Sequence, residues 1–311
     1  MEAIRAEGLA RRFGEIAAVE GLNLRVAAGE IYGLVGPDGA GKSTTLRMLA
    51  SILTPSAGHA WVAGYDVATQ ADQVKDHIAY MSQQFGLYGD LTVSENIEFY
   101  ADLYGVPARG RAARIDELLG FSQMQPYRRR LAVNLSGGMK QKLQLICALI
   151  HTPQVLLLDE PTNGVDPVSR RDFWRVLYGL LRQGVAILVS TAYLDEAERC
   201  NRVGLLSAGR VFAEGTPAEV KRLMRGQVVE LRTPRARQAA ALLTAHLPGL
   251  SIALLGDRVH VATEDPQALI SQARALLSAA GITLADVQVV EASLEDVFIS
   301  VLGSAAEQAH A

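Results

Sequence analysis

Apolar runs bounded by turn residues recur along the chain up to about residue 225 and predict a parallel β-sheet. Several of these runs show no alternation of apolar and polar positions, which is typical of strands buried on both faces of a sheet. They are Ile31–Val35, Val155–Leu158, Val185–Val189 and Val203–Leu206. A segment of helical pattern follows each run, so we expect an α/β fold. Shorter runs predict a smaller antiparallel portion near the N-terminus: Ile4–Ala6, Leu22–Val26 and Ala60–Val62.

A stretch of mainly helical periodicity, roughly residues 88–150, interrupts the predicted sheet. Its expected helices are Val93–Tyr104, Arg109–Leu119 and Met139–Ile150. We interpret this stretch as a helical subdomain inserted into a first domain of residues 1–225. The end of that domain is predicted to contain a hairpin turn, a strand and a short helix. These are Ser207–Arg210, Val211–Glu214 and Pro217–Arg225.

The pattern changes after residue 225 and predicts a second, smaller domain of residues 226–303. Its segments alternate as strand, helix, strand, strand, helix and strand, which is the order of a ferredoxin-like α/β unit. They are Val228–Leu231, Arg237–His246, Ile252–Leu255, Arg258–Val261, Pro266–Ala280 and Val287–Val290. Ser293 then caps a final helix with acidic residues in its first turn. Residues 304–311 are small and polar, and we expect a flexible tail there.

Composition and hydropathy indicate which partners and which cellular compartment to expect for the protein. The 311 residues carry a formal net charge of −3, which gives no support for a nucleic-acid partner. No apolar run approaches the ~20 residues that cross a bilayer, and the start of the chain does not resemble a signal peptide. The two cysteines, Cys147 and Cys200, are expected to be buried thiols in a reducing compartment. We therefore expect a cytoplasmic protein whose role at a membrane, if it has one, depends on a partner.

The first chemical motif follows the strand Ile31–Val35 and matches the phosphate-binding pattern G-x-x-x-x-G-K-[ST]. Its glycines let backbone N–H groups turn toward phosphate oxygens, Lys42 adds a positive charge, and the following helix contributes its dipole. The hydroxyl of Ser43 is suited to Mg²⁺. We therefore expect a nucleoside triphosphate and Mg²⁺ to bind here. The residues expected to contact the nucleotide are Gly36, Pro37, Asp38, Gly39, Ala40, Gly41, Lys42, Ser43 and Thr44.

A second motif lies at the end of the strand Val155–Leu158, which is followed by Asp159 and Glu160. Ligands of parallel sheets bind at the carboxyl ends of the strands, so both acids are expected to face the phosphates. Asp159 is predicted to hold Mg²⁺. Glu160 is predicted to orient and deprotonate the water that attacks the γ-phosphate.

Between these motifs, Leu135–Gln141 reads LSGGMKQ, and here the sequence resembles the ATP-binding cassette (ABC) ATPases. Ser136, Gly137 and Gly138 open a helix and provide a second anion site without a lysine. The resemblance implies that this site closes on ATP held by a second cassette. It also implies the fold: a P-loop NTPase cassette with a RecA-like core, an antiparallel β subdomain and a helical subdomain, followed here by the small ferredoxin-like domain.

The same resemblance assigns further residues. Phe13 falls where an aromatic ring stacks on adenine, although a core phenylalanine is the alternative. Gln83 matches a glutamine that reaches Mg²⁺ and takes part in catalysis. Asp166 matches an aspartate that bridges two cassettes. Asp38 stands where asparagine is usual, and because a carboxylate would repel phosphates we expect its side chain to face outward.

One family residue is missing. The segment Ser190-Thr191 is normally followed by a histidine that contacts the γ-phosphate and the attacking water, but here the next residue is Ala192. Loss of one preorganised polar contact to a transition state typically costs ~10²–10³ in rate. We therefore expect hydrolysis at this chain's own site to be weak. The alternative is that Glu160 suffices.

The resemblance also suggests partners. The segment Phe85–Thr92 lies where a membrane subunit of the family inserts a short helix, with local packing as the alternative. The C-terminal extension is similar to that of cassettes of the ABC-2 export class. The loop Gly36–Ser43, the segment Gln83–Leu91 and the alanine at position 192 resemble the first cassette of two-cassette multidrug exporters, which work beside ABC-2 permeases and a periplasmic adaptor protein. Such a cassette would lie on the inner face of the cell membrane and pair with itself or a different cassette. A soluble ABC ATPase of translation or DNA repair is the alternative function.

Overall fold

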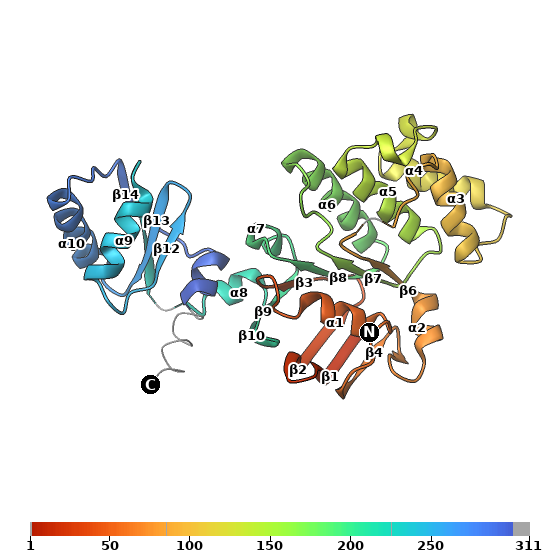
Figure 1. Ribbon diagram of the computed structural model, residues 1–311, viewed down its shortest axis with the longest axis horizontal. Helices are drawn as coiled ribbons and strands as arrows, with labels where there is room; N and C mark the ends of the chain where they lie inside the picture. The colour runs from red at the N-terminus through yellow and green to blue at the C-terminus, as the bar shows by residue number, and fades with distance from the viewer. Residues whose placement is uncertain (1, 85, 225, 301–311) are drawn as a thin grey trace. The chain divides into compact units, whose positions relative to one another are not determined.

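The computed structural model describes residues 2–84, 86–224 and 226–300 (Figure 1). Phe85 and the predicted tail of residues 304–311 lie outside the described residues. The chain divides into two compact units, Met1–Glu214 and Gly215–Ala311. The sequence predicts a domain boundary after residue 225, but the two units divide after Glu214. The short helix α8 (Pro217–Lys221) therefore belongs to the second unit instead of closing the first.

The first unit is built on a six-stranded sheet with the order β10-β9-β3-β8-β7-β6. Neighbouring strands from β9 to β6 run parallel, as predicted. Sequence reasoning missed β6, which has four residues and carries a half-buried tyrosine within its apolar pattern. The strands are β3 (Ile31–Val35), β6 (Ile78–Met81), β7 (Val155–Asp159), β8 (Ala186–Thr191), β9 (Arg202–Ser207) and β10 (Arg210–Gly215).

A four-stranded antiparallel sheet forms a second layer, and the helix α1 (Lys42–Leu49) lies between the two sheets (Figure 1). Leu46, Met48 and Leu49 of α1 are fully buried in the core that both sheets share. This packing fixes the N-terminus of α1 at the carboxyl ends of the parallel strands. The antiparallel strands are β1 (Glu2–Phe13), β2 (Ile16–Ala27), β4 (Ala57–Val62) and β5 (Tyr65–Asp66), and α2 (Ala71–His77) follows them.

Helices cover the other face of the six-stranded sheet (Figure 1). Thr92 and Glu95 form a capping box that starts α3. The helical subdomain begins close to the predicted position, and its 3₁₀ turns were not predicted. The elements are α3 (Val93–Leu103), α4 (Arg111–Phe121), the 3₁₀ turns Gln125–Tyr127 and Ala132–Asn134, α5 (Gly137–Leu149), α6 (Pro167–Leu181) and α7 (Leu194–Ala197).

The second unit has the predicted order of strands and helices. Its sheet has the order β12-β13-β11-β14 with all pairs antiparallel, which is the ferredoxin-like arrangement. Val229, Leu231, Val259 and Val261 pack one sheet face against the two helices. The elements are β11 (Gln227–Arg232), α9 (Ala236–His246), β12 (Ile252–Leu255), β13 (Arg258–Thr263), α10 (Pro266–Ala279) and β14 (Asp286–Val290), and residues 294–300 are helical.

Two smaller expectations concern the thiols and the membrane. Cys147 and Cys200 are buried and free, as predicted, and burial raises the pKa of both thiols. Within the described ranges, every helix is too short or too polar to cross a bilayer.

Candidate functional site

The loop between β3 and α1 is shaped by glycine. Gly41 adopts a left-handed conformation with φ 107° directly before α1. A Cβ atom there would lie 2.4 Å from the carbonyl oxygen of Ala18, and one at Gly36 would lie 2.2 Å from that of Leu206. Because any side chain would collide with backbone at both positions, only glycine allows this close approach. The result is a tight loop with its N–H groups at the helix N-terminus.

Lys42 is the buried cation of this loop, with only 4% of its surface exposed. Its Nζ donates hydrogen bonds to the carbonyl oxygens of Gly36 (2.7 Å) and Pro37 (3.0 Å). It also forms an ion pair with Oε1 of Glu160 at 3.0 Å. Asp38 points outward as expected: its side chain is 95% exposed and 4.0 Å from Nζ.

Asp159 is a buried acceptor at the end of β7. The hydroxyls of Ser43 (2.9 Å) and Ser190 (2.8 Å) both donate to its Oδ1. The hydroxyl of Tyr80 donates to Oδ2 at 3.3 Å, and burial together with the charge of Asp159 raises the pKa of this tyrosine. The hydroxyl of Ser43 and the carboxylate of Asp159 therefore meet, and these are hard oxygen donors of the kind that Mg²⁺ prefers.

Glu160 is held in an uncommon backbone conformation with φ 48°. Its N–H donates to Oγ of Ser190 (3.1 Å), and Nδ2 of Asn163 donates to its Oε2 (3.4 Å). The strained residue and its neighbours aim the carboxylate at the loop. A cavity of about 310 Å³ lies there, lined by Ala18, Asp38, Gly39, Gly41, Lys42, Ser43, Thr44, Gln83 and Glu160. The structure thus brings Gln83 and Glu160 to the predicted phosphate loop.

Phe13 is at the end of β1 and outside the set of residues that line this cavity. Its side chain is 47% exposed, with the guanidinium of Arg11 4.8 Å from the ring centroid. A half-exposed ring does not fit the alternative of a core phenylalanine. It leaves an aromatic face available for stacking.

The signature residues begin α5 and also lie outside the set that lines the cavity. Ser136 caps this helix by accepting a hydrogen bond from the N–H of Met139. A Cβ atom on Gly138 would lie 2.3 Å from Cβ of Ser169, whereas one on Gly137 would meet open space. Asp166 caps α6, and hydrogen bonds from Ser169 lower the pKa of its carboxyl group. These groups therefore lie at the N-termini of two helices and apart from the residues that line the cavity.

Ala192 follows β8 and is exposed. Beside it, Tyr193 donates a hydrogen bond from its hydroxyl to Oδ1 of Asn163 at 3.3 Å. Sequence reasoning missed Tyr193, Asn163, Ser190 and Tyr80 as residues of the site. Of these four residues, only Ser190 could have been found from the sequence. It lies two residues before Ala192, where its hydroxyl is beside Asp159.

Comparison with known proteins gives the family. Residues 19–163 match the protein family described as ABC transporter. The daunorubicin resistance ATP-binding protein DrrA3 of Streptomyces coeruleorubidus is 37% identical over 305 residues, which cover 97% of this chain and 96% of that protein. The probable multidrug ABC transporter ATP-binding protein YbhF of Escherichia coli (strain K12) is 41% identical over 218 residues, or 70% of this chain. This chain covers 38% of that longer relative.

A solved structure of an ATP binding subunit of an ABC transporter has the same fold. The two structures superpose with a TM-score of 0.65 at 29% sequence identity. The superposition covers 71% of this chain and 92% of the solved chain. The chain therefore belongs to the ABC transporter family, as an ATP-binding cassette. This membership confirms the family predicted from the LSGGMKQ motif, the cassette fold and the assignment to transport-coupled ATPases.

Proposed function

We propose that this chain binds ATP and Mg²⁺ and drives export through separate ABC-2 type permease subunits. The observation that carries the proposal is the cavity lined by Lys42, Ser43, Gln83 and Glu160. The chain that contains it is similar over 97% of its length to a daunorubicin resistance ATP-binding protein. The alternative of a translation or DNA-repair ATPase is not favoured, because the relatives are named as transporter or drug-resistance proteins.

Isolation from solubilised membranes tests the proposal. We expect the full chain to co-purify with a polytopic membrane protein and with ATPase activity. Recovery with ribosomes or DNA instead would contradict an export role. A periplasmic adaptor protein in the same preparation would support the closer likeness to multidrug exporters.

The nucleotide is placed by this chain's own groups. The proposed contacts are the N–H groups of residues 36–44 and the Lys42 ammonium for the phosphates, and the ring of Phe13 for adenine. Ser43 and Asp159 would hold Mg²⁺ together with Gln83, which lines the same cavity. When bound, Mg²⁺ neutralises charge on the phosphate oxygens.

The ion pair between Lys42 and Glu160 suggests how binding prepares hydrolysis. Nζ of Lys42 lies 3.0 Å from Oε1 of Glu160 and neutralises this carboxylate. The γ-phosphate competes for the same ammonium, so its arrival releases the carboxylate. Glu160 then accepts a proton from the attacking water while the helix N-terminus stabilises the phosphate charge.

The second anion site is proposed to act on a partner cassette. Ser136 and Gly138 lie at the N-terminus of α5, and Asp166 lies at that of α6. We infer that they close over ATP held by the second cassette, which is this chain or a different one. Helix N-termini favour anions, which fits the γ-phosphate as their ligand.

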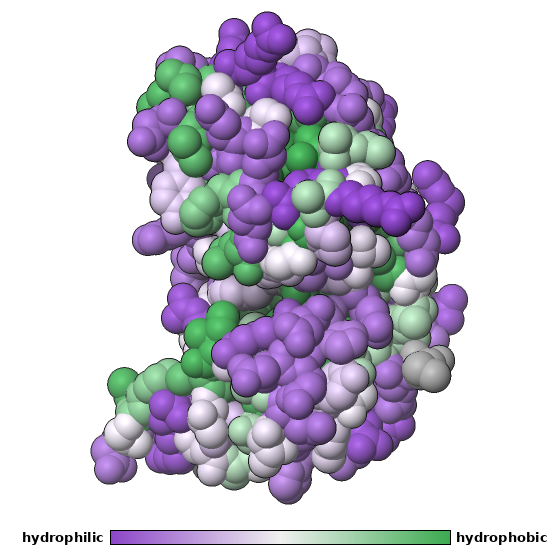
Figure 2. All heavy atoms as spheres, turned by 90° about the vertical axis from the view of Figure 1, so that its right-hand side faces the viewer, coloured by the Kyte–Doolittle hydropathy of each residue, from purple (hydrophilic) through white to green (hydrophobic). Residues whose placement is uncertain are grey.

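The permease is proposed to dock beside α3. Tyr88 (46% exposed), Phe99 (37%) and Leu103 (64%) present apolar surface there, and the rings of Tyr88 and Phe99 are 4.6 Å apart. Figure 2 shows hydrophobic side chains among hydrophilic ones on the face that includes α3. Such a patch suits a short amphipathic helix of a membrane protein. It would hold the cassette at the inner face of the cell membrane.

Replacing Ala192 with histidine is expected to raise hydrolysis by the purified chain about tenfold, below the ~10²–10³ that one transition-state contact can contribute. We expect only part of that contribution because the added imidazole would be exposed, as Ala192 is, and therefore less well oriented. The measurement is the single-turnover rate with the protein in saturating excess over ATP in the presence of Mg²⁺. Ala192→Phe, which adds bulk without a polar group, is the matched control. An equal rise with phenylalanine, or no rise with histidine, would contradict the role given to this position.

A further inference from the structure

The turn after β8 is joined to the proposed general base by two side chains. The Tyr193 hydroxyl donates to Oδ1 of Asn163 at 3.3 Å, and Nδ2 of Asn163 donates to Oε2 of Glu160 at 3.4 Å. The other carboxylate oxygen of Glu160 contacts Lys42. Each oxygen of Glu160 therefore has its own partner, one in the phosphate loop and one leading to Tyr193.

Tyr193 is itself held from several sides. Its N–H donates to Oγ1 of Thr191 at 2.9 Å, and the guanidinium of Arg170 lies 4.7 Å from its ring centroid. Arg170 also approaches Glu196, with 3.3 Å between Nε and Oε1. Such contacts restrict the rotamers of the tyrosine, so its hydroxyl is aimed at Asn163.

The buried carboxylate of Glu196 connects the two loops. It is 1% exposed and accepts hydrogen bonds from the hydroxyls of Thr162 and Thr191. Thr162 precedes Asn163, and Thr191 precedes Ala192. Both loops are therefore hydrogen-bonded to one carboxylate, and a shift of either loop is transmitted to the contact between Tyr193 and Asn163.

We propose that Tyr193, acting through Asn163, positions Glu160 for activation of water in this cassette. The proposal rests on the proposed ATPase function. Once the γ-phosphate draws Lys42 away, Asn163 keeps hold of the other oxygen of Glu160. Ala192 has no polar group for this task, whereas the tyrosine beside it does.

The test compares Tyr193→Phe with Tyr178→Phe in the full chain. Both variants remove one hydroxyl, but that of Tyr178 donates to the backbone carbonyl of Arg199 at 3.1 Å, and Tyr178 is outside the set of residues that line the cavity. We expect Tyr193→Phe to lower the single-turnover rate about tenfold, the scale of lost supporting contacts, and to leave ATP affinity unchanged. Tyr178→Phe should change neither.

A double variant separates positioning from general stability. If Tyr193 acts through Asn163, the variant Asn163→Ala, Tyr193→Phe should be no slower than Asn163→Ala alone. Additive losses, an unchanged rate in Tyr193→Phe, or equal losses of affinity and rate would overturn the inference. Failure of the native chain to bind ATP would instead overturn the proposed function.

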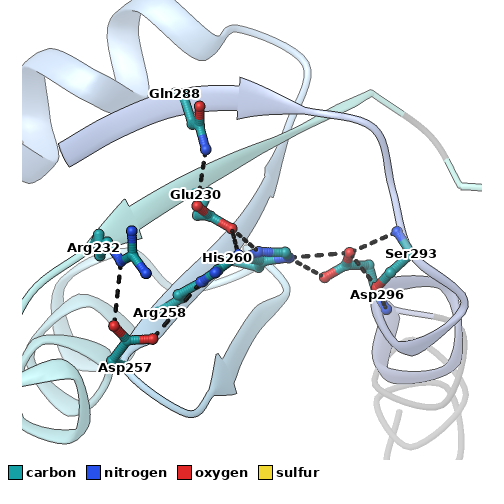
Figure 3. Close-up of polar contacts among 8 residues, drawn as sticks. All are labelled: Glu230, Arg232, Asp257, Arg258, His260, Gln288, Ser293 and Asp296. Carbon is teal, nitrogen blue, oxygen red and sulfur yellow. Dashed lines mark hydrogen bonds and ion pairs between the residues drawn. The ribbon is translucent and has the colours of Figure 1, made fainter. Parts of the chain in front are cut away.

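An independent observation concerns the second unit, on the sheet face opposite α9 and α10. Glu230 of β11 pairs in register with His260 of β13 and Gln288 of β14, so the three form a row across the sheet. Glu230 and His260 are buried, at 5% and 8% exposure. Figure 3 shows His260 between Glu230 and Asp296, which belongs to the start of the final helix.

Both ring nitrogens of His260 face carboxylates. Nδ1 is 2.9 Å from Oδ1 of Asp296, and Nε2 is 3.1 Å from Oε2 of Glu230. Only the imidazolium can donate at both nitrogens. Gln288 and Arg258 also donate to Glu230, at 3.0 and 3.1 Å. With His260 protonated, two cations therefore balance two buried carboxylates.

The hydrogen bond to Asp296 is the main cause that raises the pKa of His260 above its ordinary value. Burial alone would raise the pKa values of Asp296 and Glu230, but hydrogen bonds from His260 and their other donors lower both. The nearby ion pair of Arg232 with Asp257 is exposed. The charges around the ring therefore favour its protonated form.

Asp296 ties this cluster to the last described segment. Its carboxylate accepts from the N–H (2.8 Å) and hydroxyl (2.7 Å) of Ser293, which caps the helix. Leu294 and Val297 on either side are almost fully buried. We propose that the imidazolium of His260 clamps residues 293–297 on this sheet face and that loss of its proton loosens them.

The sign of the pH dependence follows from the direction of each shift. The contribution of the imidazolium is complete at and below the ordinary imidazole pKa of about 6.5 and is lost as the pH rises through the raised pKa of His260. The contribution of the two carboxylates is present above about pH 4 and is lost as the pH falls through their lowered pKa values. Residues 293–297 should therefore be most protected between these limits.

Hydrogen exchange of the full chain tests the clamp at pH 6.5 and 9, corrected for the intrinsic exchange rates. We expect protection of residues 293–297 to fall several-fold at pH 9. In His260→Gln it should be low at both values, whereas His246→Gln, at an exposed position on α9, should keep the native profile. Unchanged protection in His260→Gln, or an NMR titration of His260 at or below about 6.5, would overturn the proposal.

Discussion

Replacing Lys42 with alanine is expected to weaken ATP binding at least about 100-fold. Hydrogen bonds to charged groups contribute ~1.5–3 kcal/mol each, and the ammonium faces two phosphates in the proposed complex. The variant also leaves the carboxylate of Glu160 without the ammonium that lies 3.0 Å from it, so its uncompensated negative charge repels the phosphates. The measurement is calorimetric titration of the full chain with ATP and Mg²⁺.

A matched control separates the loss of this ammonium from a general change in charge. Lys75 is exposed on α2 and outside the set that lines the cavity, so Lys75→Ala removes the same charge without touching the proposed site. It should bind ATP as the native chain does. Undiminished affinity in Lys42→Ala, with the fold intact by circular dichroism, would reject the assignment of the phosphate loop.

The strands that carry the site were predictable because they are buried on both faces. Continuous apolar runs such as Val155–Leu158, bounded by turn residues, are typical of strands in a parallel sheet. The strand β6 was missed because a four-residue segment with a half-buried tyrosine gives too weak a pattern. The sheet nevertheless places Tyr80 of this strand at Asp159.

The polar connections of the site could not be predicted, because they depend on side chains far apart in sequence. Asn163 and Tyr193 are separated by 30 residues and meet only once β7 and β8 pair. Neither residue belongs to a spacing rule that marks a catalytic group. The same holds for His260 and Asp296, which are 36 residues apart and form their pair only through the folded sheet.

Some sequence patterns indicated a role without indicating its structural setting. The LSGGMKQ motif predicts a helix that begins at the anion site, and the helix is present from Gly137. The motif does not reveal that Gly138 packs against Ser169 of α6. That contact decides which substitution can test the site cleanly, since a side chain at Gly138 would also separate the two helices.

A carboxylate at Gly137 is therefore the sharper probe of action on a partner cassette. A Cβ atom at this position meets open space, so Gly137→Asp adds negative charge to the helix N-terminus without a collision. The partner cassette can carry the histidine that Ala192 replaces in this chain. In that case most hydrolysis should come from the ATP that is bound to the partner's phosphate loop and covered by this chain's α5. We expect Gly137→Asp to lower transporter turnover about 100-fold, the scale of a lost preorganised contact to the transition state.

Glu160→Gln in this chain should cost less than about threefold, because hydrolysis beside Ala192 contributes little to the total. The measurement is ATPase activity of the reconstituted transporter with each variant introduced separately. Gly137→Asn has the same shape as the aspartate without its charge, and it should retain much of the activity. Equal losses from Gly137→Asp and Glu160→Gln, or a larger loss from Glu160→Gln, would show that this cassette hydrolyses ATP efficiently despite Ala192.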